Sequence, residues 1–309
     1  MIYLPIAEIP VNMLLILSLG GLGGLLAGMF GIGGGFLITP LLMFIGIPPA
    51  VAVATSGNQI IASSVSGFLA HWRRNNVDMK MGAYLLLGGV IGSLIGIILF
   101  AILQMTGQID LAISLIYVVF LGMIGTLMAI ESSRTILRQK HGHAPAPHQQ
   151  QGGRFGIWLR SLRLPMQTSF PRSGVELSAI LPVLIGMVSG VMVALMGIGG
   201  GFVMIPAMIY LLAMPTVIVV GTSLFQIIFV TSLVTLLHAI GTESVDIVLA
   251  ALLIAGGVVG AQVGTVLGLK LPAERLRILL ALIVLGVCIL LAVGLFLEPE
   301  NLYSVTVIE

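Results

Sequence analysis

Charged residues are scarce in this chain: Asp, Glu, Lys and Arg together make up 8% of its 309 residues. A soluble domain carries about 25% charged residues, so this composition excludes a protein whose whole surface faces water. Hydrophobic residues make up 58%, and the mean hydropathy is +1.19. The apolar runs are continuous and do not alternate with polar residues, which excludes a transmembrane β-barrel.

Long stretches of the chain lack charge altogether. A hydrocarbon core of ~30 Å needs about 20 apolar residues per helical crossing. Four charge-free segments meet this length: Ala83–Ala101, Leu111–Ile130, Ile247–Leu269 and Ile278–Leu297. Two longer stretches, Ile9–Ala70 and Leu177–Thr242, also contain no Asp, Glu, Lys or Arg. The sequence therefore predicts an all-α, polytopic membrane protein.

Features of catalytic and metal sites are also missing. The one cysteine, Cys288, lies in an apolar segment, which excludes an intramolecular disulfide. The chain has no His-Glu-x-x-His motif, no Walker A motif and no acidic cluster for a metal. Ala54-Thr55-Ser56-Gly57 differs by one residue from the Gly-x-Ser-Gly of intramembrane serine proteases, but the second copy ends in Leu224. We expect no enzyme, metal, cofactor or nucleic-acid partner.

The strongest pattern that is present is an internal repeat. Gly-Ile-Gly-Gly-Gly-Phe occupies residues 31–36 and again residues 197–202, and a proline follows each copy at Pro40 and Pro206. Further matches keep the same order, at an offset of 166 to 168 residues: Pro48 with Pro215, Thr55-Ser56 with Thr222-Ser223, Gln59 with Gln226, His71 with His238, Asp78 with Asp246, and Gly88-Gly89 with Gly256-Gly257. The chain is therefore a duplication.

The repeat divides the chain into three parts. Residues 1–138 form the first transmembrane repeat and residues 177–309 the second. Between them, residues 139–176 are rich in Pro, Gln, Gly, His and basic residues, which predicts a flexible basic cytoplasmic linker. The N-terminal residues 1–10 contain an acid and no base, so we do not expect a cleaved signal peptide.

The charges favour opposite orientations for the two halves. The stretch Ile9–Ala70 holds either two crossings and a re-entrant piece or three crossings, one of them short and broken. With three crossings in each long stretch, every Lys and Arg lies on one side of the membrane, and most acids lie on the other. The positive-inside rule therefore favours an inverted repeat with about 4–5 transmembrane segments in each half.

Glycines also form stripes at helical spacing. Gly88, Gly92 and Gly96 lie on one face of a predicted helix, and Gly256, Gly260 and Gly264 lie on one face of another. Small residues at this spacing let helix backbones approach closely, so we interpret the stripes as packing surfaces.

The two glycine motifs are candidate anion sites. Each predicts a broken helix or half-helix that restarts near Phe36 or Phe202, with free N–H groups and the positive end of the helix dipole at the gap. Inverted-repeat transporters bind substrate near the bilayer midplane at such breaks. The alternative is that the glycines only permit close helix crossing. The candidate residues are Gly31, Gly33, Gly34, Gly35 and Phe36, and Gly197, Gly199, Gly200, Gly201 and Phe202.

Neutral polar residues in the long apolar stretches extend the candidate site. Hydroxyl and amide groups can donate hydrogen bonds to an oxyanion without a fixed charge. The residues are Thr55, Ser56, Asn58 and Gln59 in the first half and Thr222, Ser223 and Gln226 in the second. The alternative is that the hydroxyl groups bond to their own helix backbone. His71 and His238 are candidate proton-relay residues, or histidines at the membrane boundary with no special role.

The duplicated glycine motif with its proline, the Thr-Ser pair and the later glycine stripe resemble the TauE/SafE sulfite exporter family, the toluene sulfonate uptake permease group. The likeness covers nearly the whole chain except the linker. It implies transport of sulfite, thiosulfate, sulfoacetate, sulfonates or related organic acids across a prokaryotic plasma membrane, and proton coupling is commonly proposed for relatives. The resemblance implies that the substrate site includes the glycines and the Thr-Ser pairs named above. It does not decide between import and export of the anion.

These patterns together predict a multi-pass secondary transporter of the cell inner membrane, whose partners are a small anion and the lipid bilayer. The two breaks and the polar residues would form one shared site, exposed to either side by alternating access. A passive anion channel and a transporter of other organic acids are the nearest alternatives. A membrane scaffold without transport activity is a more distant one.

Overall fold

The computed structural model describes residues 2–30, 32–140, 167–270 and 273–296. Within these ranges the chain forms ten α-helices, one short π-helix and two β-hairpins. Most of the predicted linker, residues 141–166, lies outside the described residues.

Each half begins with a hairpin, and five α-helices follow. The first half contains β1 (Ile2–Leu4), β2 (Ile9–Val11), α1 (Met13–Phe30), α2 (Gly35–Phe44), α3 (Pro49–Arg73), α4 (Met79–Met105) and α5 (Ile109–Lys140). The second half contains β3 (Gln167–Phe170), β4 (Val175–Ser178), α7 (Ile180–Met196), α8 (Gly201–Tyr210), α9 (Thr216–Leu237), the π-helix η1 (His238–Thr242), α10 (Ile247–Lys270) and α11 (Ala273–Phe296).

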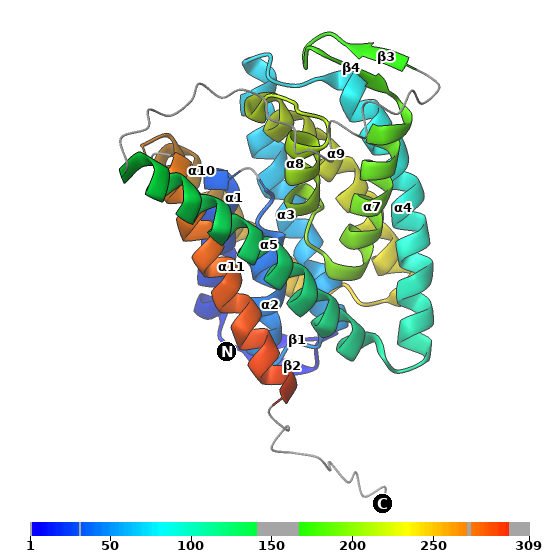
Figure 1. Ribbon diagram of the computed structural model, residues 1–309. Coiled ribbons are helices and arrows are strands. Elements are labelled where there is room, and N and C mark those ends of the chain that lie inside the picture. Colours follow the sequence, from blue (N-terminus) through cyan, green and yellow to red (C-terminus); the bar gives the residue numbers. More distant parts are fainter. Residues whose placement is uncertain (1, 31, 141–166, 271–272, 297–309) are drawn as a thin grey trace, which may run out of the picture.

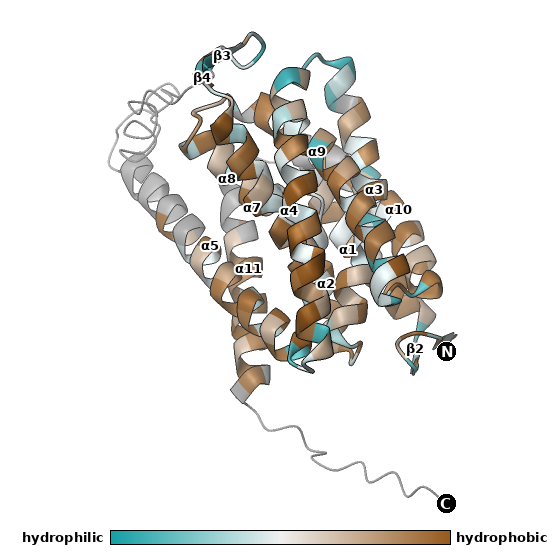
Figure 2. Cartoon of the chain, turned by 90° about the vertical axis from the view of Figure 1, so that its right-hand side faces the viewer, coloured by the Kyte–Doolittle hydropathy of each residue, from teal (hydrophilic) through white to brown (hydrophobic). Residues whose placement is uncertain are grey.

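The predicted helical membrane class is confirmed. Among the described residues, five helices are long and apolar enough to cross a membrane by length and composition. Figure 2 shows apolar residues along the sides of the bundle and hydrophilic residues mainly at its two ends. Large apolar side chains such as Leu87, Ile98 and Ile102 of α4 are exposed on the outside. A surface with this much exposed apolar area suits lipid and not water.

The glycine stripes pack helices of one half against helices of the other. α1 lies along α10, and α4 lies along α7. A side chain at Gly256 would overlap the carbonyl oxygen of Leu17, and one at Gly88 would overlap the carbonyl oxygen of Val183. The backbones therefore touch, and the packing role predicted for these stripes is confirmed.

α2 and α8 are half-length helices that fold back on the helix before them. Each has 10 residues and is therefore about 15 Å long, half the thickness of the hydrocarbon core. Ile38 of α2 packs on Gly23 of α1, and Leu42 shares an apolar cluster with Ile16, near the start of α1. Figure 1 shows α2 and α8 in opposite parts of the bundle.

The two hairpins lie at opposite ends of the bundle (Figure 1). β1–β2 buries Leu4 and Val11, and β3–β4 buries Phe170 and Leu177. Residues 167–176, which belong to the predicted linker, form most of the β3–β4 hairpin. The segment is ordered because Phe170 and Leu177 are buried against α4 and α8, contacts that its polar composition does not reveal.

Candidate functional site

Both glycine motifs interrupt a helix. α1 ends at Phe30 and α2 begins at Gly35, while α7 ends at Met196 and α8 begins at Gly201. We call residues 31–34 the first break and residues 197–200 the second break; Gly31 itself lies outside the described residues. The φ angles are 91° and 76° at residues 33 and 34, and 82° and 74° at residues 199 and 200. Only glycine adopts this left-handed region without strain, so the motif itself produces the break.

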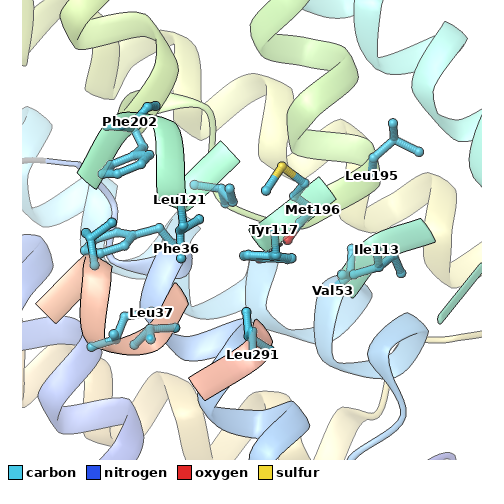
Figure 3. Close-up of a cluster of buried hydrophobic side chains, with 14 of the residues drawn as sticks. Phe36, Leu37, Val53, Ile113, Tyr117, Leu121, Leu195, Met196, Phe202 and Leu291 are labelled. Atoms are coloured by element: carbon cyan, nitrogen blue, oxygen red, sulfur yellow. Dashed lines mark hydrogen bonds between the residues drawn. The ribbon is translucent and has the colours of Figure 1, made fainter. Parts of the chain in front are cut away.

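The two breaks lie directly against each other. The rings of Phe36 and Phe202 are stacked, with centroids 4.9 Å apart and planes 7° from parallel (Figure 3). A Cβ atom on Gly35 would lie 2.8 Å from the carbonyl oxygen of Gly197, and one on Gly201 would lie 2.8 Å from that of Ile32. Two motifs far apart in the sequence therefore form one structural unit.

The half-helices begin inside this unit. Their N-cap residues are Gly34 and Gly200, and neither provides a side-chain hydrogen bond to the helix start. The first N–H groups of any helix have no acceptor within the helix, and its N-terminus carries a positive partial charge. The positive ends of α2 and α8 are thus brought to one place in the core, an arrangement that suits an anion.

Side chains of α3 and α9 pack on both breaks. Ile60 and Ile227 each lie beside Gly33 and Gly199. Ser63 Oγ donates a hydrogen bond to Gly33 O at 3.3 Å. In this conformation the breaks are thus covered by two isoleucines and by the stacked phenylalanines.

Of the two Thr-Ser pairs, Ser56 is placed at the second break. Its hydroxyl lies 3.3 Å from Gly197 O and 2.8 Å from Thr39 Oγ1 of α2. The sequence interpretation missed Thr39, although it lies four residues after Gly35 and therefore on the same face of α2. It also missed Tyr117, whose hydroxyl donates to Met196 O at the end of α7. A buried tyrosine in the charge-free segment 111–130 was the available signal.

Thr55 and Thr222 lie elsewhere, at opposite ends of the bundle. Thr55 Oγ1 accepts a hydrogen bond from Asp246 N, before α10, and Thr222 Oγ1 accepts one from Asp78 N, before α4, both at 3.0 Å. The structure therefore does not bring these threonines together.

Asn58 and Ser223 bond to their own helices. Asn58 Nδ2 donates to Thr55 O at 3.3 Å, and Ser223 Oγ donates to Val220 O at 2.9 Å. Ser56 Oγ also lies 3.1 Å from Val53 O, so both serines make the bond within their own helix that the alternative for the hydroxyl groups describes.

The two glutamines are buried without partners. Gln59 and Gln226 have 0% exposure, and among the described residues no hydrogen bond reaches either amide nitrogen or oxygen. Gln59 lies against Gly257 of α10, and Gln226 lies against Gly89 of α4. Leaving a buried polar group unpaired costs about 1–3 kcal/mol, so four such atoms at equivalent positions need a reason.

The two histidines are separated, because they lie near the C-terminal ends of α3 and α9. His238 is buried; its Nε2 donates to Ala194 O at 3.0 Å, and its ring makes a T-shaped contact with the ring of Phe100. The Nδ1 atom of His71 has no partner among the described residues. No three His, Cys, Asp or Glu side chains of the described ranges lie close enough together to hold a metal ion.

Known proteins resemble the chain over most of its length. The family model described as sulfite exporter TauE/SafE matches residues 16–291. A probable membrane transporter protein of Xylella fastidiosa (strain 9a5c) is 29% identical over 282 residues, which cover 90% of this chain and 94% of the relative. Probable membrane transporter protein YjnA of Bacillus subtilis (strain 168) is 29% identical over 270 residues, covering 87% and 96%.

A plant protein matches a shorter part. Sulfite exporter TauE/SafE family protein 1 of Arabidopsis thaliana is 31% identical over 131 residues, which cover 42% of this chain and 27% of that protein. No solved structure matches the chain significantly. The family match, the full-length relatives and the apolar helices agree, and the chain belongs to the TauE/SafE sulfite exporter family of multi-pass membrane transporters.

Proposed function

We propose that this protein is a secondary transporter that carries small sulfur-containing anions, such as sulfite or a sulfonate, across a prokaryotic inner membrane by alternating access. The observation that carries the proposal is the meeting of two helix N-termini at the paired glycine breaks. Two positive helix ends without side-chain caps attract an oxyanion without a lysine or arginine. The sulfur chemistry of the substrate is inferred from the family description.

Polar groups of α2, α3 and α9 would complete the site. Ser56 and Thr39 already lie at the second break. Gln59 and Gln226 supply two amide groups for which the described part of the chain offers no partner. Buried polar groups without partners are expensive unless another state of the protein uses them. We assign them to the anion-bound state.

The arrangement of the elements supports an inverted repeat. The equivalent hairpins β1–β2 and β3–β4 lie at opposite ends of the bundle, and the contact of α1 with α10 is repeated by the contact of α7 with α4. Two basic residues lie at the β3–β4 end: Lys80 donates a hydrogen bond to Ser169 O, and Arg172 donates one to Val77 O. Under the positive-inside rule this end is therefore the cytoplasmic one.

The packing of the breaks favours a carrier over the rival function, a passive channel. A channel needs a continuous wet path, whereas Ile60, Ile227 and the stacked Phe36 and Phe202 occupy the place where the breaks meet. An anion can reach the helix ends only if these groups separate. A site that must open to load its substrate suits alternating access.

Proton coupling is the second part of the proposal. His71 and His238 lie near opposite ends, so each would exchange protons with one side only. His238 is engaged by Ala194 O, whereas Nδ1 of His71 has no partner among the described residues. His71 is therefore the better candidate of the two.

The test is a flux assay on purified protein in liposomes. Sulfite, thiosulfate, sulfoacetate and methanesulfonate are compared with acetate, with and without an imposed proton gradient. We expect saturable flux of at least one sulfur anion, accelerated by the same anion on the other side. Flux equal to that of protein-free vesicles would contradict transport of these anions. A conductance that does not saturate would favour the channel.

A further inference from the structure

Two buried carboxylates lie outside the proposed anion site. Asp78 is 2% exposed and Asp246 is 0% exposed, and they occupy equivalent positions in the two halves. Buried carboxylates are rare unless paired or hydrogen-bonded, so the contacts of both residues identify their role.

Asp246 joins three elements. Its Oδ1 atom accepts a hydrogen bond from Leu249 N at 3.0 Å and so caps the start of α10. Its Oδ2 atom accepts one from Ile6 N, in the turn of the β1–β2 hairpin, at 2.9 Å. Its own N–H donates to Thr55 Oγ1 of α3 at 3.0 Å. We call these four residues the Asp246 cluster.

Asp78 repeats this arrangement at the other end. Its Oδ1 atom accepts from Met81 N at 3.1 Å, and its N–H donates to Thr222 Oγ1 at 3.0 Å. Its Oδ2 atom accepts from both N and Oγ of Ser173, between β3 and β4, at 3.0 and 2.6 Å. We call these four residues the Asp78 cluster. Arg172 also fastens this hairpin, because its guanidinium donates to Val77 O at 2.8 Å.

Each cluster joins the two halves of the chain. Asp246 belongs to the second half, whereas Ile6 and Thr55 belong to the first. Asp78 belongs to the first half, whereas Ser173 and Thr222 belong to the second. The clusters also lie at opposite ends of the bundle, as the two hairpins do in Figure 1. The halves are thus fastened to each other at both ends.

Each hairpin covers the outer end of a half-helix. Leu4 and Val11 pack in one apolar cluster with Leu42 of α2. Phe170 and Leu177 pack in another with Met208 of α8. α2 and α8 lead directly from the breaks to these covers. Movement of a hairpin would therefore free one half-helix and leave the other in place.

We propose that the Asp246 and Asp78 clusters are the two gates of the carrier, and that they release one at a time. This inference rests on the proposed alternating access. Release of one cluster uncovers its half-helix and lets the elements joined by that cluster move apart at that end. The intact cluster keeps the opposite end closed. Simultaneous release would open both ends and convert the carrier into a leak.

The division of labour between the carboxylate oxygens allows a selective test. In both residues Oδ1 caps the helix and Oδ2 holds the hairpin. Asparagine is as good an N-cap as aspartate, but its amide nitrogen accepts no hydrogen bond. Asp246→Asn and Asp78→Asn should therefore keep the helix caps and lose the bonds that the hairpins donate from Ile6 N and Ser173 N.

The experiment measures the accessibility of a cysteine under each hairpin. Cys288→Ala gives a full-length background without cysteine. Ala52→Cys reports on the β1–β2 end and Val219→Cys on the β3–β4 end; both sites have 0% exposure and equivalent places in the repeat. The probe is a cationic maleimide, chosen so that it does not resemble an anionic substrate. The protein is labelled in detergent, where both ends meet the solvent.

We expect Asp246→Asn to raise the labelling rate of Ala52→Cys about tenfold, and that of Val219→Cys by less than about twofold, since a hydrogen bond to a charged group is lost at one end only. Asp78→Asn should show the reverse with a change of similar size, because the bond from Ser173 N is lost whereas the Ser173 hydroxyl can turn to accept from the asparagine amide. Thr55→Val and Thr222→Val, which remove the acceptors of the two aspartate N–H groups, should reproduce the same end-specific pattern.

Two outcomes would overturn the proposal: no change at the near end, or equal acceleration at both ends, which indicates general loosening. Flux of sulfite by the Cys288→Ala protein is measured separately in liposomes. If sulfite is transported but labelling does not follow the end-specific pattern, the gate proposal is wrong and the proposed transport function stands. The right pattern with no flux of any tested anion means that the hairpins open independently but that the proposed function fails.

Discussion

The two glycine breaks have the same sequence and similar φ angles at their last two glycines but different surroundings. Each lies between a helix that ends and a half-helix that begins, with two successive left-handed glycines. At the second break, Ala194 and Met196 are buried, and their carbonyl groups accept hydrogen bonds from His238 and Tyr117. At the first break, the last three residues of α1 are only partly buried. α11, which corresponds to α5 in chain order, contains no tyrosine.

The glycine motif therefore determines where the helix is interrupted, whereas segments distant in the sequence determine which side chains surround the interruption. The glycines fix the interruption locally, because other residues are strained at these φ angles. The partners of the preceding helix come from distant segments, and these diverged after the duplication. We therefore expect transport to need glycine at both breaks, and the side chains around the two breaks to matter unequally.

The largest effect is expected from removal of the break glycines. In Gly34→Ala and Gly200→Ala the new side chain is strained by the positive φ angle, at a cost of about 1–2 kcal/mol, and it also has no room. Gly34→Ala should be the more harmful, since its Cβ would overlap the backbone oxygen of Gly23, whereas Gly200→Ala meets the side chain of Ser189. Liposome flux should be abolished in both.

Gly286→Ala is the matched control. A Cβ there meets nothing within 4 Å. Alanine also favours the helix, so flux and thermal stability should be kept. Normal flux in Gly34→Ala would show that transport does not depend on the first break.

Tyr117→Phe should affect the second break alone. The substitution leaves Met196 O without its donor, and we expect the free energy of unfolding to fall by about 1–3 kcal/mol, together with a lower flux. Thermal unfolding in detergent measures the first effect. Tyr84→Phe, whose ring packs on Phe170 at the β3–β4 end, should change neither. Equal effects of Tyr117→Phe and Tyr84→Phe would mean that the Tyr117 hydroxyl does not specifically stabilise the second break.

Gln59→Leu and Gln226→Leu should shift stability and transport in opposite directions. Each removes two buried polar atoms without partners, which should raise the free energy of unfolding by about 1 kcal/mol. Each should also raise the anion concentration needed for half-maximal flux, because a ligand of the bound state is lost. A fall in stability with unchanged flux would assign the glutamines to structure instead.

The smallest effect is expected from substitution of the histidines, and it should differ between His71 in the first half and His238 in the second half. His238→Gln loses the bond to Ala194 O and should cost about 1 kcal/mol of stability, whereas His71→Gln should cost less than about half of that. If proton coupling uses His71, that variant should transport without response to an imposed proton gradient. If flux in both variants still responds fully to the proton gradient, neither histidine takes part in proton coupling.

The helical class could be predicted from the sequence alone, because charge scarcity and apolar run length act locally. The glycine motifs predicted a break in each half, because the backbone freedom of glycine is also a local property. The sequence did not predict the hairpins, the partners of Thr55 and Thr222, or the burial of Asp78 and Asp246. These features depend on contacts between residues that lie far apart in the chain, such as Ile6 with Asp246. A local pattern shows that Thr55 is polar and enclosed, but only the fold shows which donor it meets.

The central claim is that the two breaks form one shared anion site, and binding stoichiometry tests it most directly. Equilibrium dialysis of purified protein with radiolabelled sulfite is compared for the native chain, Gly34→Ala and Gly200→Ala. The account predicts a single sulfite per chain, with binding lost when either glycine alone is replaced. Two sulfite ions per chain, with half of the binding surviving each substitution, would contradict it.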